Sequence, residues 1–156
     1  MTFHFDTKAY LERIGLTAAP PVNEEGLTQL HNAQFFSIPF ENFDIQLGRE
    51  ISLNKAAIFN KLVLNKRGGY CFELNGLMEM ALEHFGFRSR PLLARVHLTP
   101  VPSSRTHLLN LVAFRHANWI IDAGFGAGGL RGPIPLENRT FHFGEDYSSQ
   151  LEERPP

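Results

Sequence analysis

The feature that most restricts how this chain can fold is a lone cysteine, preceded by two glycines and followed by apolar residues at helical spacing. Cys71 is the only cysteine in 156 residues, and it follows Gly68 and Gly69. Apolar residues then recur at the spacing of one helix face: Leu74, Leu77, Met78, Ala81, Leu82 and Phe85. Gly86 predicts the end of this helix, because glycine adopts the left-handed conformation of a C-cap without strain. The pattern predicts a helix that begins at or just after Cys71.

This position gives Cys71 the surroundings of a reactive thiol. The dipole and the unpaired N–H groups of a helix N-terminus favour an anion, and the thiolate is the nucleophilic form of cysteine. Gly68 and Gly69 allow a sharp turn and leave room for a molecule to approach the sulfur. The alternative is a buried structural cysteine, because free cysteine is among the most buried residue types. The glycines favour the reactive thiol, since a structural cysteine needs no open approach.

Charge, hydropathy and cysteine content exclude several classes of protein. The formal net charge is -1, so the chain has no electrostatic footprint for nucleic acid. No apolar run approaches the roughly 20 residues that span a bilayer, and the first six residues do not resemble a signal peptide. A single cysteine cannot form an internal disulfide, which fits a reducing compartment. We therefore expect a cytoplasmic protein with neither a membrane nor a nucleic-acid partner.

Residues 1–86 predict a helical bundle. Asp6 is expected to cap a first helix and Asn23 a second, because their side chains accept hydrogen bonds from first-turn N–H groups. A third helix is expected to begin near Ser52 or Asn54. The helix after Cys71 completes the bundle.

Residues 87–156 predict antiparallel strands instead. Four segments have strand-like patterns: 90–98, 106–114, 118–123 and 140–143. The short polar connection between the second and third segments favours a hairpin. Helices followed by antiparallel strands indicate an α+β fold with two domains, one over 1–86 and one over 87–156.

A nucleophilic cysteine needs a base and a third group that orients the base. His107 opens a strand ahead of apolar residues, where packing alone does not require a polar side chain, but His97 lies in an equally strand-like context. Asp122 lies at the end of the partner strand in an apolar run, where a carboxylate must be paired. It could also be a turn residue before Gly124. A hairpin with an even-numbered loop would place His107 and Asp122 on one face, two to four positions apart.

Two other kinds of site have weaker support. Cys71 has no second cysteine and no neighbouring Cys/His spacing typical of zinc, so we expect no metal. The loop 123–129 contains Gly124-x-Gly126-x-Gly128, but no helical pattern follows it. It therefore predicts neither a Rossmann nor a P-loop phosphate site.

Four segments together resemble the arylamine N-acetyltransferase family. They are Ile38-Pro39-Phe40-Glu41-Asn42, Arg67-Gly68-Gly69-Tyr70-Cys71-Phe72-Glu73-Leu74-Asn75, Thr106-His107-Leu108-Leu109 and Ile121-Asp122-Ala123-Gly124-Phe125-Gly126. They occur in the family's order. The resemblance implies a papain-like catalytic triad of Cys71, His107 and Asp122. It also implies ping-pong transfer of an acetyl group from acetyl-CoA, through acetyl-cysteine, to arylamines, arylhydrazines or N-hydroxyarylamines.

The resemblance further implies binding residues and architecture. Phe125 and Phe40 would contact the aromatic acceptor. The residues near the CoA phosphates would be Ser103, Ser104, Gly124, Gly126, Gly128 and Gly129. The helical domain would be followed by a β-barrel, and family members continue into a third, α/β domain. We therefore expect an unfinished barrel, self-association or dependence on another chain, and low activity for these 156 residues.

Two other functions stay open. A cysteine hydrolase or a transglutaminase-like enzyme shares the Cys-His-Asp chemistry and differs in its acceptor, so detection of acetyl transfer would separate it. A non-catalytic relative could retain the three residues by descent, and its Cys71 would be unreactive.

Overall fold

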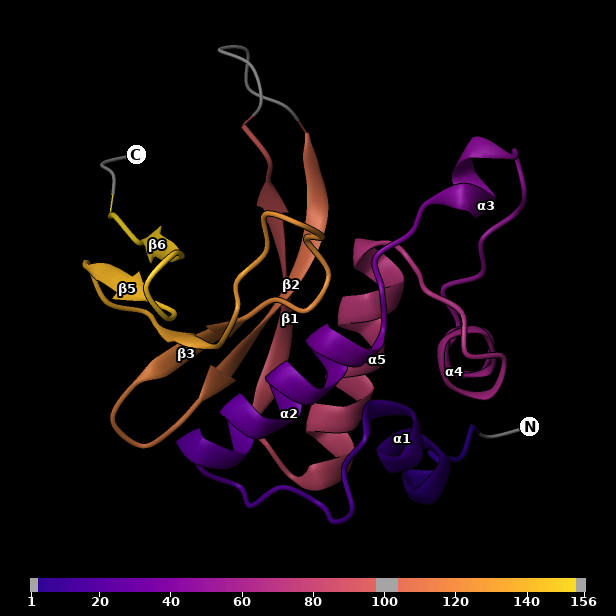
Figure 1. Cartoon of the computed structure of the whole chain (residues 1–156), viewed down its shortest axis with the longest axis horizontal. Coiled ribbons are helices and arrows are strands. Elements are labelled where there is room, and N and C mark those ends of the chain that lie inside the picture. Colours follow the sequence, from indigo (N-terminus) through magenta and orange to yellow (C-terminus); the bar gives the residue numbers. More distant parts are fainter. Residues whose placement is uncertain (1–2, 98–103, 154–156) are drawn as a thin grey trace.

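Helices form the first half of the chain and strands the second half in the computed structural model, which describes residues 3–97 and 104–153 (Figure 1). The helical elements are α1 (Thr7–Ile14), α2 (Glu24–Ser37), α3 (Phe43–Gln46), α4 (Lys55–Phe59), the π-helical turn η1 (Asn60–Leu64) and α5 (Cys71–Phe85). The strands are β1 (Ser89–Arg95), β2 (Arg105–Ala113), β3 (Asn118–Ile121), β4 (Ile134–Pro135), β5 (Thr140–His142) and β6 (Ser148–Gln150). The expected combination of helices with antiparallel strands is confirmed, while the two-domain division stays a prediction.

Local signals in the sequence begin and end the main helices. The side chains of Asp6, Asn23 and Asn54 accept hydrogen bonds from first-turn N–H groups at 3.0, 2.8 and 2.7 Å. Gly15 and Gly86 end α1 and α5 in the left-handed conformation, at φ 74° and 90°. These boundaries follow the sequence because each signal lies within a few residues of the end that it forms.

The strands form two open antiparallel sheets, one in the order β1-β2-β3-β4 and one of β5 with β6. Asn110 pairs with Ile121 and Ala113 with Asn118, which confirms the expected hairpin around residues 114–117. Neither sheet closes on itself over the described residues, so the barrel implied by the resemblance stays a proposal.

Three short elements depart from the expectations. The elements α3, β4 and β6 contain 4, 2 and 3 residues, too few to show a period in the sequence. Pairing with neighbouring strands forms β4 and β6 instead, as where β4 aligns Pro135 with Trp119 of β3. The expected third helix is also extended, because α4 continues directly into η1.

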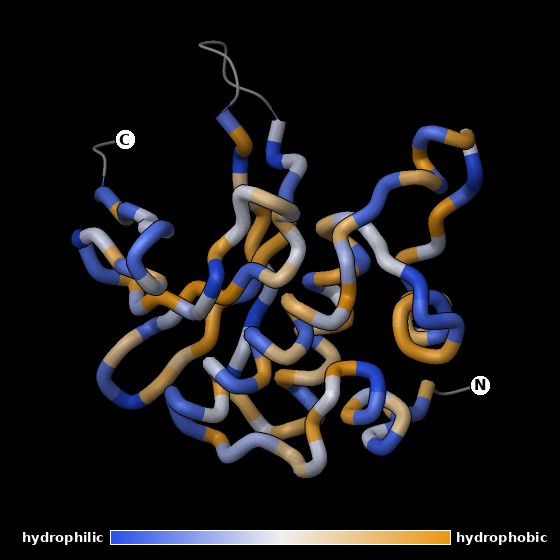
Figure 2. Tube along the Cα trace, in the orientation of Figure 1, coloured by the Kyte–Doolittle hydropathy of each residue, from blue (hydrophilic) through white to orange (hydrophobic). Residues whose placement is uncertain are grey.

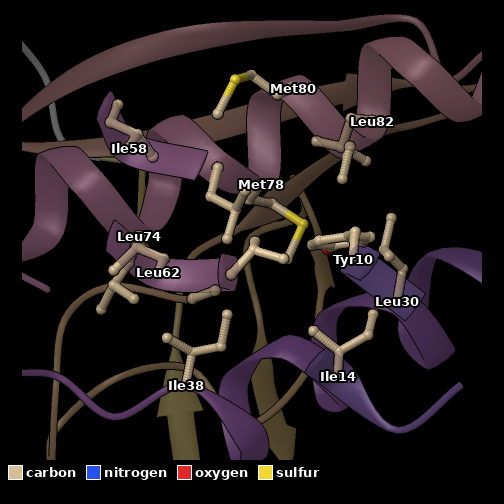
Figure 3. Packing of buried hydrophobic residues seen from close by; sticks show 14 of the residues in the cluster. Tyr10, Ile14, Leu30, Ile38, Ile58, Leu62, Leu74, Met78, Met80 and Leu82 are labelled. Carbon is tan, nitrogen blue, oxygen red and sulfur yellow. The ribbon is translucent and has the colours of Figure 1, made fainter. Parts of the chain in front are cut away.

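Helix α5 lies between the other helices and the larger sheet (Figure 1). Five of the six residues in its predicted apolar stripe are at most 1 % exposed, namely Leu74, Leu77, Met78, Ala81 and Leu82. The sixth, Phe85, is half-buried. In Figure 3, Leu74 and Met78 of α5 lie among side chains from the other helical segments. Burial on both sides makes α5 a rigid support for the cysteine at its first residue.

Apolar side chains are also exposed at one edge of the molecule. Figure 2 shows hydrophobic segments in the interior and again at α3. There, Phe43, Ile45 and Leu47 are 67, 46 and 63 % exposed. Self-association stays a prediction, because the structure contains one chain. Within the described part of the chain, no helix has the length and hydropathy needed to cross a membrane.

Candidate active site

Cys71 is the first residue of α5 and is half-buried. Before it, Tyr70 is the N-cap, and its N–H donates to Glu73 Oε2 at 3.2 Å. The Cys71 sulfur lies 3.8 Å from the carbonyl oxygen of Thr106, at the start of β2. The first N–H groups of a helix have no partner within the helix, so the start of α5 presents donors beside the sulfur. The expected position of Cys71 at a helix N-terminus is confirmed.

His107 and Asp122 form the closest polar contact behind this cysteine. His107 Nε2 lies 2.6 Å from Asp122 Oδ2, and each residue is only 5 % exposed. Asp122 follows the residue that pairs with Asn110, so it lies two positions along the ladder from His107, on the same face. The other candidate base, His97, lies exposed after β1. The structure therefore brings His107, and not His97, against Asp122.

The pKa of His107 depends on opposing effects. Burial lowers it, but hydrogen bonds with Asp122 and Cys71, together with the charges of both partners, raise it to about 9. Nε2 faces Asp122, which leaves Nδ1 as the ring nitrogen for the Cys71 sulfur. At pH 7 the ring is thus an imidazolium between a carboxylate and the cysteine.

Asp122 is held in place from several directions. Its Oδ1 accepts from Asn75 Nδ2 at 2.8 Å and from the N–H of Gly124 at 3.0 Å. The N–H of Ala123 donates to Asn75 Oδ1 at 2.9 Å. On the other side, His31 Nε2 donates to the carbonyl oxygen of Asp122 at 3.1 Å. These bonds leave Oδ2 directed at the imidazole.

The sequence pattern does not indicate what Asn75 and His31 do. Asn75 is fully buried in α5 beside its apolar stripe, and His31 is fully buried on the inner face of α2. Burial lowers the pKa of His31 despite its hydrogen bonds, so its ring is neutral at pH 7. In the sequence, the only indication of such a role is a polar residue on an otherwise apolar helix face. This indication does not show which residue the side chain contacts.

The loop after Asp122 lies directly against the nucleophile's backbone. A Cβ added to Gly124 would lie 2.7 Å from Asn75 Nδ2 and 3.1 Å from Cys71 Cα. Gly126 has φ 84° and faces the Phe40 ring, 3.3 Å from the nearest atom that a Cβ would meet. Glycine is therefore required at both positions, at the first by close approach and at the second by backbone conformation.

The two expected acceptor-binding residues lie around this loop. The Phe125 ring is 5.0 Å from the His107 ring in an edge-on arrangement and is 40 % exposed. Phe40 lines a pocket of about 420 Å³. The other lining residues are Phe35, Ile38, Ala123, Gly126 and Ala127. An apolar pocket of this kind suits a flat aromatic ligand.

The expected CoA residues are placed less uniformly. Ser103 lies outside the described residues, and Ser104 is exposed directly before β2. The carbonyl oxygens of Gly128 and Gly129 accept hydrogen bonds from the Tyr147 hydroxyl at 3.1 and 2.7 Å. The hairpin of β5 and β6 thus holds the far end of the glycine loop. Over the described residues, no group of three or more His, Cys, Asp or Glu side chains is arranged to hold a metal ion.

We expect the stabilisation from His107 to disappear at alkaline pH. Its pKa is about 9 in the folded chain against 6.5 for an ordinary histidine, so the stabilisation is complete below about pH 6.5 and is lost as the pH rises through 9. The contribution is at most about 3 kcal/mol of unfolding free energy. Urea unfolding between about pH 6 and pH 10, compared with His107→Gln, measures it. Identical pH dependence in both proteins would contradict the imidazolium assignment.

Comparison with known proteins identifies the class of protein that this fold and site define. The family model described as N-acetyltransferase matches residues 24–149. The arylamine N-acetyltransferase of Escherichia coli is 46 % identical over 129 residues, which cover 81 % of this chain and 46 % of the relative. A Salmonella typhimurium protein named arylamine N-acetyltransferase / N-hydroxyarylamine O-acetyltransferase is 46 % identical over 83 % of this chain and 47 % of its own length.

Solved structures agree with the sequence comparison. The arylamine N-acetyltransferase of Nocardia farcinica superposes with a TM-score of 0.89 at 35 % identity, over 97 % of this chain and 55 % of that one. The structure of the Mycobacterium marinum arylamine N-acetyltransferase in complex with CoA superposes with a TM-score of 0.86 at 34 % identity. The match covers 96 % of this chain and 57 % of that one. The chain belongs to the arylamine N-acetyltransferase family, which confirms the resemblance. It spans about half the length of the curated relatives it matches.

Proposed function

We propose that Cys71 accepts an acetyl group from acetyl-CoA and passes it to the nitrogen of an arylamine or arylhydrazine, or to the oxygen of an N-hydroxyarylamine. The observation that carries this proposal is the 2.6 Å contact between Asp122 and His107, the base that faces Cys71 at the start of α5. The names of the relatives support the acceptor class, and the CoA complex of the Mycobacterium marinum enzyme supports the donor.

In the first half of the reaction, Cys71 is the nucleophile. His107 already holds the thiol proton as the imidazolium, and the sulfur of Cys71 forms a bond to the acetyl carbon while the bond from that carbon to the departing CoA sulfur breaks. His107 returns its proton to the departing sulfur. Asp122 stabilises the imidazolium and holds its orientation. The N–H groups at the start of α5 stabilise the negative charge that develops on the acetyl oxygen.

In the second half, Cys71 is the leaving group. The acceptor nitrogen attacks the acetyl carbon, His107 takes a proton from that nitrogen, and Cys71 departs as the thiolate. Phe40 and Phe125 would orient the aromatic ring beside the acetyl group. Both half-reactions use the same base, which is why one His-Asp pair suffices.

The residues present fit a thioester donor. The Cys71 sulfur is half-buried rather than enclosed, and the absence of side chains at Gly124 and Gly126 keeps the adjoining loop narrow. Acetyl-CoA would supply an activated acetyl group at this sulfur. Ser104 and the loop from Gly124 to Gly129 would hold the remainder of the donor. The assignments of Ser103 and of a cytoplasmic location stay proposals.

We expect Cys71 to gain one acetyl group when the chain is incubated with acetyl-CoA in the absence of an amine. Intact mass measurement detects the addition, and peptide mapping assigns it to the residue. Addition of an arylamine should then remove the group and yield the acetylated amine. Cys71→Ala is the matched control. The covalent route would be refuted if the wild-type chain never gained the acetyl group, or if Cys71→Ala gained it to the same extent.

A further inference from the structure

Five charged side chains form a cluster beside the helix that carries Cys71, and we call them the charge cluster: Glu41, Asp44, Lys61, Arg67 and Glu73. Lys61 Nζ lies 2.7 and 2.8 Å from the two carboxylate oxygens of Glu73 and 2.9 Å from Asp44 Oδ2. Arg67 Nη2 lies 2.8 Å from Glu41 Oε1 and 3.0 Å from Asp44 Oδ2. The cluster therefore joins η1 and the segment around α3 to the first turn of α5.

Lys61 is the centre of this cluster and stays cationic. Its side chain is 15 % exposed, and the side chain of Glu73 is 3 % exposed. Burial lowers the pKa of Lys61, but hydrogen bonds to Glu73 and Asp44 outweigh burial and raise it. Hydrogen bonds from Arg67 and Lys61 lower the pKa of Asp44 to about 2. Lys61 is thus a cation that is ion-paired with both Glu73 and Asp44.

Glu73 is the member of the cluster closest in sequence to the nucleophile. It is the third residue of α5, where its carboxylate accepts the N–H of Tyr70. Burial raises the pKa of the Tyr70 hydroxyl most, and the charges of Cys71 and Glu73 raise it further. Both charges therefore act on the residue that precedes α5. An unneutralised carboxylate there would oppose a second anion at Cys71, because like charges disfavour ionisation.

We propose that Lys61 is a positioning residue of the reaction, which neutralises Glu73 and so leaves the positive end of α5 available to the Cys71 anion. This inference rests on the proposed role of Cys71 as the nucleophile. Lys61 acts on Cys71 through Glu73, to which its ammonium group donates two hydrogen bonds. The capping bond from Tyr70 to Glu73 can then form without leaving a bare carboxylate at the start of α5.

Other charged groups face these two residues and are held constant in the test. His107, backed by Asp122, faces Cys71 from β2, and Tyr70 precedes it. Glu41, Asp44 and Arg67 complete the charge cluster around Lys61. Substitutions at Lys61 and Glu73 therefore change the charge at the start of α5 and leave the imidazole that faces Cys71 in place.

The test is the pH dependence of Cys71 alkylation by iodoacetamide, which needs no acetyl-CoA. Lys61→Met should raise the pH midpoint of alkylation by about one unit, because it leaves the Glu73 charge uncompensated. Glu73→Gln alone should lower the midpoint, and the double variant Lys61→Met/Glu73→Gln should return it to near the wild-type value. If Lys61→Met shifted the alkylation midpoint only through loss of packing, removal of the Glu73 charge would not restore the wild-type midpoint.

Lys55→Met is the matched control, because Lys55 forms a 2.9 Å ion pair with Glu83 near the other end of α5. It should leave the midpoint unchanged. A folded Lys61→Met with a wild-type midpoint, or a double variant that keeps the shift, would overturn the inference. If Lys61→Met does not fold, an unchanged midpoint in Glu73→Gln would do the same. Failure of acetyl uptake would count against the proposed function alone, and the alkylation shifts would still decide the role of Lys61.

Discussion

In a version of the chain extended to the length of its relatives, replacing Cys71 with serine is expected to reduce the proposed acetyl transfer to an arylamine by at least about a thousandfold, while the fold stays intact. A serine hydroxyl is far less acidic than a thiol, so His107 cannot generate a comparable nucleophile from it. The substitution removes little packing, since the sulfur is half-buried, and a serine hydroxyl can keep the hydrogen bonds with Thr106 O and His107. The unfolding free energy should therefore change by no more than about 0.5 kcal/mol.

Release of coenzyme A and formation of the acetylated amine measure this effect. Cys71→Ala provides the baseline of a chain without any nucleophile at the position, and urea unfolding shows that both variants are folded. Turnover by the serine variant within a factor of about ten of the wild type would rule out a cysteine-bound intermediate.

Ionisation of the thiol explains only part of such an effect. A free thiol with a pKa of about 8.5 is a few per cent ionised at pH 7, so complete ionisation adds roughly thirtyfold, or about 2 kcal/mol. Lower thiol basicity also reduces nucleophilicity, with a Brønsted slope of about 0.4–0.5. The larger share must come from positioning, from the N–H groups at the start of α5 and from proton transfer by His107. The site therefore depends on how rigidly its parts are held.

The sequence predicts the parts of the site that depend on local rules. The start of α5 follows from its apolar period, and its end follows from Gly86, which lies directly after its last residue. Strand alternation predicts that His107 and Asp122 share a face, because their separation across the hairpin depends only on the loop length. The choice between His97 and His107 needs the register, which the pattern alone does not supply.

The supports of the site could not be predicted because their partners are remote in the chain. His31 bonds to a backbone oxygen 91 residues away, and Asn75 bonds to Asp122 across 47 residues. Lys61 and Glu73 are closer, at 12 residues, but the π-helical turn η1 lies between the end of α4 and the glycine pair. A regular helical period does not continue through such a turn, so the pattern does not show that Lys61 faces Glu73.

Replacing Asn75 with alanine will lower the unfolding free energy by roughly 3–5 kcal/mol. The Asn75 side chain donates to Leu108 O at 2.6 Å and to Asp122 Oδ1 at 2.8 Å, and it accepts from Ala123 N at 2.9 Å. Alanine would leave these groups short of a partner in a site where Asn75 is fully buried, and each such group costs about 1–3 kcal/mol. Asp122 would keep its bond from Gly124 N but lose its fixed orientation.

Asn75→Asp separates loss of hydrogen bonds from loss of orientation, because it keeps the shape of the side chain. It would place a second carboxyl group against Asp122 Oδ1, where like charges and burial raise the pKa of the pair. The variant should therefore become more stable as the pH falls from about 8 to about 5, since the folded state binds the extra proton more tightly than the unfolded state. Urea unfolding at several pH values measures this trend, and Asn60→Ala, at an exposed position of η1, is the control expected to stay within about 0.5 kcal/mol. If Asn75→Ala loses less than about 1 kcal/mol, or Asn75→Asp shows the wild-type pH dependence, the Asn75–Asp122 bond does not hold the site together.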